Sequence, residues 1–353
     1  MTIVFAILLF SFLIFIHELG HFLAAKASGV RVVEFALFMG PAIFKKTVGE
    51  TTYSLRCIPI GGFCQMEGED EESDDPHAFG NAAWWKRIII LVAGAAMNLI
   101  AGFLLLFIVN LPAQGFVTPQ IVESHPASLI VREDGLQVGD RILQIDGENV
   151  YVASDFSMLL SLDPKETYDI LVDRQGEKVF LDDFAMVTVP IVDENGVESQ
   201  KYGITFGVEE NNFLNSLKYT WYNTLDTVRT VRLSLKMLLT GQAGLMEMSG
   251  PVGIVQIMSD TAAQSDGFLD ALLNLLYFGG FIAINLAVMN LLPIPALDGG
   301  RVVGLLLTVV IEKITRKKLN SKYEAIIHGV GMVLLLILMA VILFKDVFVI
   351  FKG

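Results

Sequence analysis

Cysteine is scarce in this 353-residue sequence, which contains only Cys57 and Cys64. Two thiols cannot make the dense disulfide framework that stabilises small secreted domains. No histidine lies near them in the sequence, so they do not form the pattern of a structural zinc site. We interpret both as ordinary thiols and expect no disulfide, because the topology derived below places them on the cytosolic side.

Charged residues are also few. They make up 18% of the chain, whereas 53% of the residues are hydrophobic and the mean hydropathy is +0.58. This composition excludes an ordinary soluble protein and indicates an integral membrane protein. The net charge of −13 comes from one segment, since residues 112–210 hold 19 acidic and 6 basic residues, a difference of −13. We interpret that segment as a soluble insert, and we expect no nucleic-acid partner.

Four apolar segments are long enough to cross a bilayer, whose core takes about 20 helical residues. They lie in residues 1–27, 88–111, 271–311 and 325–344. Basic residues gather in the loop after the first segment and between the last two, and such loops face the cytosol. The N-terminus, the acidic insert and the C-terminus are therefore expected outside. The basic residues between the last two segments are Lys313, Arg316, Lys317, Lys318 and Lys322.

The first apolar segment carries ionisable residues. His17 and His21 are four residues apart, so on a helix both project from one face, with Glu18 one step round. In this HExxH pattern two imidazoles can bind one metal ion, and the glutamate reaches a water beside it. The alternative is a chance match with satisfied core histidines. Ionisable groups inside a membrane helix are costly and rarely persist without a task, which favours metal binding.

A catalytic zinc site takes three protein ligands, so one more must come from elsewhere. Asp298 is the only acidic residue in the third apolar segment. Pro293, Pro295, Gly299 and Gly300 surround it and cannot sit in a regular helix, so this stretch should be unwound. Unwound backbone at membrane depth is tolerated where it is buried in protein or lines a watery cavity. The alternative is a proline-kinked structural span with a stray aspartate.

The loop over residues 28–87 contains two β-prone runs, Ala42–Val48 and Thr51–Ile58, separated by a Gly-Glu turn. They predict a hairpin over about residues 42–66 that dips into the membrane beside the site. It either aligns an extended substrate by strand addition or only plugs the helix bundle. In the second span, small residues permit close helix contact, and Asn98 should bond across to another helix. Whether that bond is structural or orients the site stays open.

Residues 116–207 alternate between apolar runs and turn signals, and their stretch 135–147 is similar to a PDZ domain. Gly139 and Gly147 would make turns around a short strand at 141–145. Such a domain offers a groove for an extended chain, or it acts as a size filter above the site. Residues 213–240 then predict a charged amphipathic helix on the outer membrane face or against the insert.

Together these motifs resemble the site-2 protease family, in its bacterial RseP-like branch with PDZ domains. The resemblance covers nearly the whole chain. It rests on the HExxH segment, the PDZ-like insert and three motifs: Pro59-Ile60-Gly61-Gly62-Phe63, Ser249-Gly250-Pro251-Val252-Gly253 and Asn290 to Gly300. Two departures are Ala95, where the family often has proline, and an insert long enough for one PDZ domain instead of two.

The resemblance implies an intramembrane endopeptidase with Zn²⁺ bound by His17, His21 and Asp298 and with Glu18 as general base. Its substrates would be single-span membrane proteins, such as anti-sigma factors or leftover signal peptides. The hairpin would be a membrane-re-entrant loop. Candidate substrate-binding residues are Asn290, Pro293, Pro295, Gly61, Gly62, Phe63 and Asn98.

The expected fold is an α-helical integral membrane protein with about four transmembrane helices, a membrane-associated β-hairpin and one extracytoplasmic PDZ (α+β) domain. We place it in a bacterial plasma membrane, with the site in the cytosolic part of the bilayer. One rival is a non-hydrolytic PDZ receptor with structural metal, but such sites are usually closed by four protein ligands. The other is a zinc protease for soluble peptides, which leaves ligands within spans unexplained. The sequence does not decide the oligomeric state.

Overall fold

The computed structural model describes residues 2–69, 71, 73–192, 196, 198–242, 244, 250–316 and 321–352. The chain divides into two compact units, each taken here by itself. Unit 1 comprises Met1–Val109 and Thr227–Gly353, and unit 2 comprises Asn110–Asp226. Lys317 and Lys318, used above for orientation, and Ser249 of the predicted motif lie outside the described residues.

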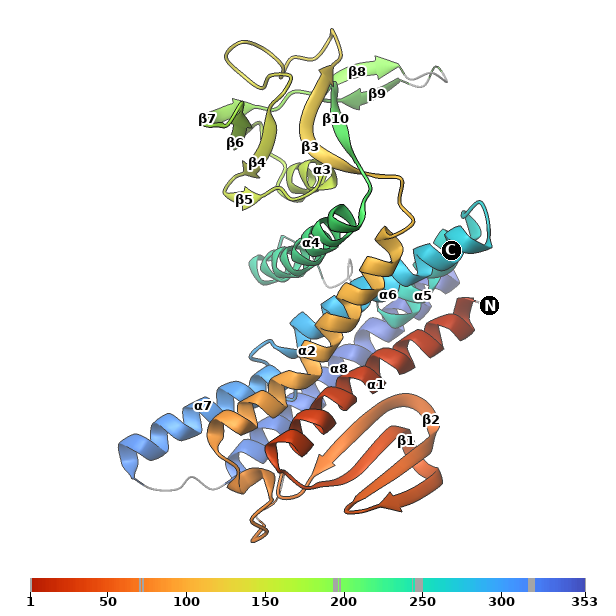
Figure 1. Ribbon diagram of the computed structural model, residues 1–353, viewed down its shortest axis with the longest axis vertical. Helices are drawn as coiled ribbons and strands as arrows, with labels where there is room; N and C mark the ends of the chain where they lie inside the picture. The colour runs from red at the N-terminus through yellow and green to blue at the C-terminus, as the bar shows by residue number, and fades with distance from the viewer. Residues whose placement is uncertain are drawn as a thin grey trace. The chain divides into compact units, whose positions relative to one another are not determined.

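Unit 1 is built from long helices and one β-ribbon (Figure 1). Within the described residues, four helices are long and apolar enough to cross a membrane. These four candidate spans lie in α1, α2, α6 and α8, and each overlaps one of the apolar segments predicted from the sequence. The helices are α1 (Thr2–Ser28), α2 (Trp84–Asn110), α5 (Pro251–Ala263), α6 (Phe268–Asn290), α7 (Asp298–Thr315) and α8 (Ser321–Lys352), with a short 3₁₀ turn at Phe79–Asn81 and with α4 (Phe213–Thr240) joining the two units.

The third predicted span is interrupted, as its prolines predicted, but Gly299 and Gly300 lie in helix α7 and not in the unwound stretch. Residues 271–311 hold two helices, because α6 ends at Asn290 and α7 begins only at Asp298. Of the two, only α6 has the length and hydropathy of a span. The break has a physical cause: Pro293 and Pro295 lack the N–H that would continue the α6 hydrogen-bond ladder.

Glycines let the helices of unit 1 approach closely. A Cβ at Gly20 of α1 would lie 2.7 Å from the carbonyl carbon of Ala93 in α2. A Cβ at Gly102 of α2 would lie 2.9 Å from the carbonyl oxygen of Gly280 in α6. Lipid tails are as apolar as leucine, so such backbone contact and packing, more than hydrophobic burial, holds membrane helices together. The sequence thus brings α1, α2 and α6 into direct contact.

The β-ribbon of unit 1 is longer than the predicted hairpin over 42–66. It consists of β1 (Val32–Val48) and β2 (Thr51–Met66) around the turn at Gly49. Phe35 pairs with Cys64 on one side and with Tyr53 on the other, so the two strands fold back on themselves. Gly40 and Gly61 have φ of 85° and 79°, a region that favours glycine, and they lie where the strands bend.

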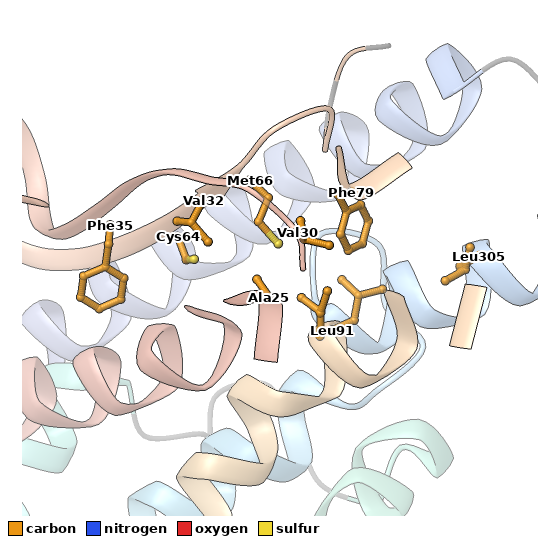
Figure 2. Close-up of a cluster of buried hydrophobic side chains, with 10 residues drawn as sticks. Ala25, Val30, Val32, Phe35, Cys64, Met66, Phe79, Leu91 and Leu305 are labelled. Atoms are coloured by element: carbon orange, nitrogen blue, oxygen red, sulfur yellow. The ribbon is translucent and has the colours of Figure 1, made fainter. Parts of the chain in front are cut away.

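An apolar cluster fixes this ribbon to the helices (Figure 2). Its members come from the end of α1 and the residues just after it, both strands, the 3₁₀ turn at Phe79–Asn81, the start of α2, and α7. Because the cluster includes residues on either side of the ribbon's base, it holds β2 against α1. The buried members are Ala25, Val30, Val32, Phe35, Cys64, Met66, Phe79, Ile90, Leu91 and Leu305.

One buried carboxylate anchors the far part of α8. Asp346 accepts backbone hydrogen bonds from Gly250 at 3.3 Å and from Gly253 at 3.1 Å, at the N-terminus of α5. Lys345 lies 3.4 Å from the same carboxylate. A helix N-terminus leaves backbone N–H groups without partners inside the helix and favours negative charge. Asp346 therefore caps α5 from a neighbouring helix.

Unit 2 is a small α+β unit around one sheet. The strands of the sheet run in the order β10-β3-β4-β6-β7, with β5 paired to β4, and α3 (Ala153–Leu162) belongs to the same unit. The strands are β3 (Gly115–Ser124), β4 (Arg141–Ile145), β5 (Glu148–Asn149), β6 (Thr167–Arg174), β7 (Glu177–Ala185) and β10 (Ile204–Glu210), and a separate hairpin pairs β8 (Val189–Val192) with β9 (Glu198–Lys201).

A buried ion pair ties the sheet of unit 2 together. Asp140 is fully buried before β4, and both of its carboxylate oxygens lie 2.8 Å from the guanidinium of Arg174 in β6. Asp140 raises the pKa of Arg174 through this bidentate hydrogen bond. Gly139 and Gly147, with φ of 102° and 77°, turn the chain on either side of β4. Strand β4 covers the residues predicted for it, and the PDZ assignment stays a prediction.

Candidate metal centre

The two histidines of the HExxH segment face α2. His21 is buried, and its Nδ1 lies 2.8 Å from the backbone carbonyl oxygen of Ile90. Gly94 stands opposite both rings, and a Cβ there would lie 2.8 Å from His17 Cε1. Only glycine leaves room for two imidazoles at this depth of the helix pair.

Asp298 joins them from the first residue of α7. Its Oδ2 lies 3.3 Å from His17 Nε2 and 3.4 Å from His21 Nε2, and the two Nε2 atoms are 3.2 Å apart. A tetrahedral zinc ion with ligands at about 2.0–2.1 Å separates its ligand atoms by about 3.3 Å. The observed triangle therefore has the dimensions of one face of such a site. Among the described residues, no other three His, Cys, Asp or Glu side chains bring their ligand atoms close enough together to hold a metal ion.

The protonation of the triangle points to a cation. A carbonyl oxygen only accepts, so His21 must donate its Nδ1 hydrogen to Ile90, and a neutral imidazole then presents a lone pair at Nε2. Asp298 Oδ2 is buried and has no hydrogen-bond partner among the residues that the structure describes. Two imidazole nitrogens and this carboxylate oxygen are all ligand types that zinc binds. A metal ion would give the carboxylate oxygen a partner, so the residues present fit a zinc ion.

Glu18 lies next to the triangle and against strand β2. A Cβ at Gly62 would come within 3.3 Å of Glu18 Cγ and 3.0 Å of the Ala36 carbonyl oxygen. Burial raises the pKa of the Cys64 thiol well above its usual range. Its sulfur is not among the ligand atoms that meet in the triangle, so Cys64 is not a fourth ligand. The ribbon therefore packs against the side chain of Glu18, which directly follows the ligand candidate His17 in α1.

The stretch between α6 and α7 bends tightly to bring Asp298 in. Side-chain atoms at Gly299 and Gly300 would overlap the backbone carbonyls of Leu291 and Ile294, so both positions require glycine. Ala296 has φ of 78°, a left-handed conformation that is strained for a residue with a Cβ. The loop thus stores backbone strain directly before the third member of the triangle.

Comparisons with known proteins agree with this geometry. The model of peptidase family M50 matches residues 5–338. A putative zinc metalloprotease of Clostridium perfringens is 38% identical over 349 residues, covering 98% of each chain. The regulator of sigma-W protease RasP of Bacillus subtilis is 28% identical over 431 residues, again covering 98% of each.

The chain belongs to peptidase family M50. Membership in this family confirms the resemblance to the site-2 proteases and the prediction of a metalloendopeptidase. A further relative, a putative zinc metalloprotease of Campylobacter jejuni, is 31% identical and covers 97% of this chain and 92% of its own. Because the match runs through both units and all the membrane helices, it concerns the whole architecture and not the HExxH segment alone.

The predicted substrate-binding residues of this M50 peptidase fall into two groups. The amide Nδ2 atoms of Asn98 and Asn290 both lie 3.5 Å from His17 Nδ1, and Asn98 is almost fully buried. The others are spread over the ribbon and the loop before α7: Gly61, Gly62 and Phe63 in β2, with Phe63 4.8 Å from the Arg56 guanidinium, and Pro293 and Pro295, of which Pro293 is exposed. The structure thus places both amides next to a histidine of the metal site. The substrate-binding role of the residues in β2 and in the loop stays a prediction.

Sequence reasoning missed three contributors to the site. The Ile90 carbonyl and Gly94 act through the positions of their backbone atoms, which cannot be predicted from residue type. His328 of α8 accepts a hydrogen bond from the backbone N–H of Ala296 at 3.0 Å. A signal for it existed, since an ionisable residue early in an apolar span is costly unless it has a partner.

Asn98 is expected to orient His17. If His17 Nε2 faces the ion, its Nδ1 carries a hydrogen and needs an acceptor. Asn98 Oδ1 is buried without a partner among the described residues, and a 180° turn of the amide would place this oxygen on Nδ1. We expect Asn98→Leu to weaken zinc affinity by about 10- to 100-fold, the usual cost of losing an outer-shell partner.

The measurement is competition for zinc against a chromophoric chelator in detergent. Leu99→Ala changes the neighbouring, more exposed position of the same helix and serves as the control. Equal zinc affinity in Asn98→Leu and the control would show that the amide is only a helix-packing residue.

Proposed function

We propose that this M50 peptidase is an intramembrane zinc endopeptidase that cleaves the membrane-spanning segments of single-span proteins. The observation that carries the proposal is the triangle of His17, His21 and Asp298. Its edges of 3.2 to 3.4 Å match a zinc site, and its members come from a candidate membrane span and from the helix that follows another. Three protein ligands leave one position for water or substrate, as catalytic zinc sites require.

The residues around the triangle have separate tasks in hydrolysis. Zinc bound by His17, His21 and Asp298 would supply a Lewis acid that polarises the scissile carbonyl and lowers the pKa of water. Glu18 would accept the proton of the attacking water and then donate it to the leaving amine nitrogen. Its contact with Gly62 of strand β2 would keep the side chain in place between these two transfers.

Strand β2 offers a means of aligning the substrate. Gly62 of this strand contacts Glu18 and pairs with Leu37 of β1, and Gly61 and Phe63 flank it in the sequence. A substrate helix hides its carbonyls in internal hydrogen bonds, so it must be unwound before attack. An extended stretch added to this strand would satisfy its backbone while it is unwound. Asn290 and the loop with Pro293 and Pro295 would contact the same stretch from the other side.

The proposed substrates are of the anti-sigma factor or remnant signal peptide type. The name of the Bacillus subtilis relative, a regulator of sigma-W protease, supports the first class. In this proposal unit 2 is an extracytoplasmic PDZ domain that binds or filters the substrate. In the same proposal the metal centre lies in the cytosolic part of a bacterial plasma membrane, which the basic loops support.

The test uses the full chain reconstituted in lipid vesicles with a panel of single-span reporters. We expect cleavage inside the reporter's apolar segment, loss of cleavage after zinc is removed with a membrane-permeant chelator, and recovery when zinc is added back. A soluble peptide of the same sequence, free in solution, should be cleaved poorly. Cleavage that survives complete zinc removal, or that favours the soluble peptide, would overturn the proposal.

A further inference from the structure

Helix α8 touches the loop before Asp298 at two positions about one turn apart. We call residues 291–297, between α6 and α7, the ligand loop. His328 Nδ1 accepts the backbone N–H of Ala296 at 3.0 Å. At Gly331, a Cβ would lie 2.8 Å from both the carbonyl carbon and the carbonyl oxygen of Pro295. Most of the other described side chains of α8 are exposed, so these contacts are specific to the ligand loop.

The contact acts on the strained point of the loop. Ala296 is the residue with φ of 78°, and its N–H follows Pro295, which has no N–H of its own. A backbone N–H can only donate, so His328 must present an unprotonated Nδ1. Gly331 lets α8 come close enough for this bond to form, because any side chain there would collide with Pro295. The two α8 residues therefore support one backbone conformation of the loop.

That conformation decides where Asp298 points. Ala296 precedes Asp298 by two residues, and Leu297 between them is the N-cap of α7. Leu297 N–H bonds to the Ile294 carbonyl at 3.1 Å, and Arg301 N–H bonds to the Leu297 carbonyl at 3.1 Å, so little of this turn is free to adjust. A rotation at Ala296 would swing the Asp298 carboxylate away from the two imidazoles.

We propose that His328 is a positioning residue of the metal centre, which holds the ligand loop so that Asp298 meets His17 and His21. This inference rests on the proposed function, since it assumes that the triangle binds zinc. It adds a role for α8, a helix that contributes none of the three ligands. It also explains a histidine in an apolar helix, where an imidazole without a task is costly.

The test compares two replacements of similar size. In His328→Asn the amide Oδ1 takes nearly the place of the imidazole Nδ1 and still accepts, whereas in His328→Leu the acceptor is lost. Zinc affinity, measured by chelator competition, should fall by about 10- to 100-fold in His328→Leu and stay within about threefold of wild type in His328→Asn, because outer-shell partners act at this scale. His328→Gln, whose oxygen reaches the Nε2 position instead, should resemble His328→Leu.

Two glycines of α8 provide a second, matched comparison. Gly331→Ala should displace Pro295 and weaken zinc binding, while Gly329→Ala, where a Cβ meets nothing within 4 Å, should leave it unchanged. If gel filtration and thermal unfolding show that His328→Leu does not fold, the zinc affinities of these two glycine variants test the positioning role in its place.

The two proposals can fail separately. A wild-type protein that does not bind zinc refutes the proposed function itself. Wild-type protein that binds zinc, with equal affinity in His328→Leu and His328→Asn or in the two glycine variants, refutes only the positioning role.

Discussion

Glu18→Gln should leave the protein folded and loaded with zinc but reduce cleavage of a single-span reporter by about 10²- to 10⁴-fold, the contribution of positioned proton transfer. Glutamine has nearly the shape of glutamate, so the contact with Gly62 can persist. What it lacks is the ability to take a proton from water. The rate should therefore fall through kcat, with little change in KM.

The measurement is single-turnover cleavage in vesicles, with zinc content determined on the same samples. Glu50→Gln, at the exposed turn of the ribbon, is the matched control and should cleave like wild type. The inactive variant should also retain bound substrates, so single-span proteins captured with it from the native membrane would identify the physiological targets. Full activity in purified Glu18→Gln would remove Glu18 from the mechanism.

The sequence predicted the parts of the site that depend on residue type and spacing. His17 and His21 share a helix face by their separation, and Asp298 was found because an acidic residue is rare in an apolar segment. A third ligand from elsewhere in the chain was expected because a catalytic zinc site takes three protein ligands. The structure adds the distances between the ligand atoms, which match one face of a zinc site.

Other features were out of reach because they depend on backbone positions between distant segments. The ribbon was expected over about 42–66, yet Phe35 also pairs with both Tyr53 and Cys64, which β-propensity alone cannot indicate. The third span was expected to be a single broken helix over 271–311. Spacing shows where a helix must stop, but not that α7 restarts at the ligand itself. The bond from Ala296 to His328 spans 32 residues and has no local pattern.

Asp298→Asn should abolish tight zinc binding and, with it, all cleavage. Asparagine keeps the shape of the side chain, so the ligand loop and the start of α7 can retain their fold. It removes the negative charge that balances the ion, and its amide oxygen is a weaker ligand for zinc than a carboxylate. We expect zinc affinity to fall by more than about 100-fold, which is the upper range for losing a mere outer-shell partner.

Asp346→Asn is the appropriate control for this change. It also neutralises a buried aspartate of unit 1, but one whose partners are the backbone N–H groups of Gly250 and Gly253 and the ammonium of Lys345. This control should lower the thermal unfolding midpoint, because it weakens the cap on α5, and should keep zinc affinity close to that of wild type. If Asp298→Asn binds zinc as tightly as Asp346→Asn, the third ligand is not Asp298, and the convergence of α1 with α7 has another purpose.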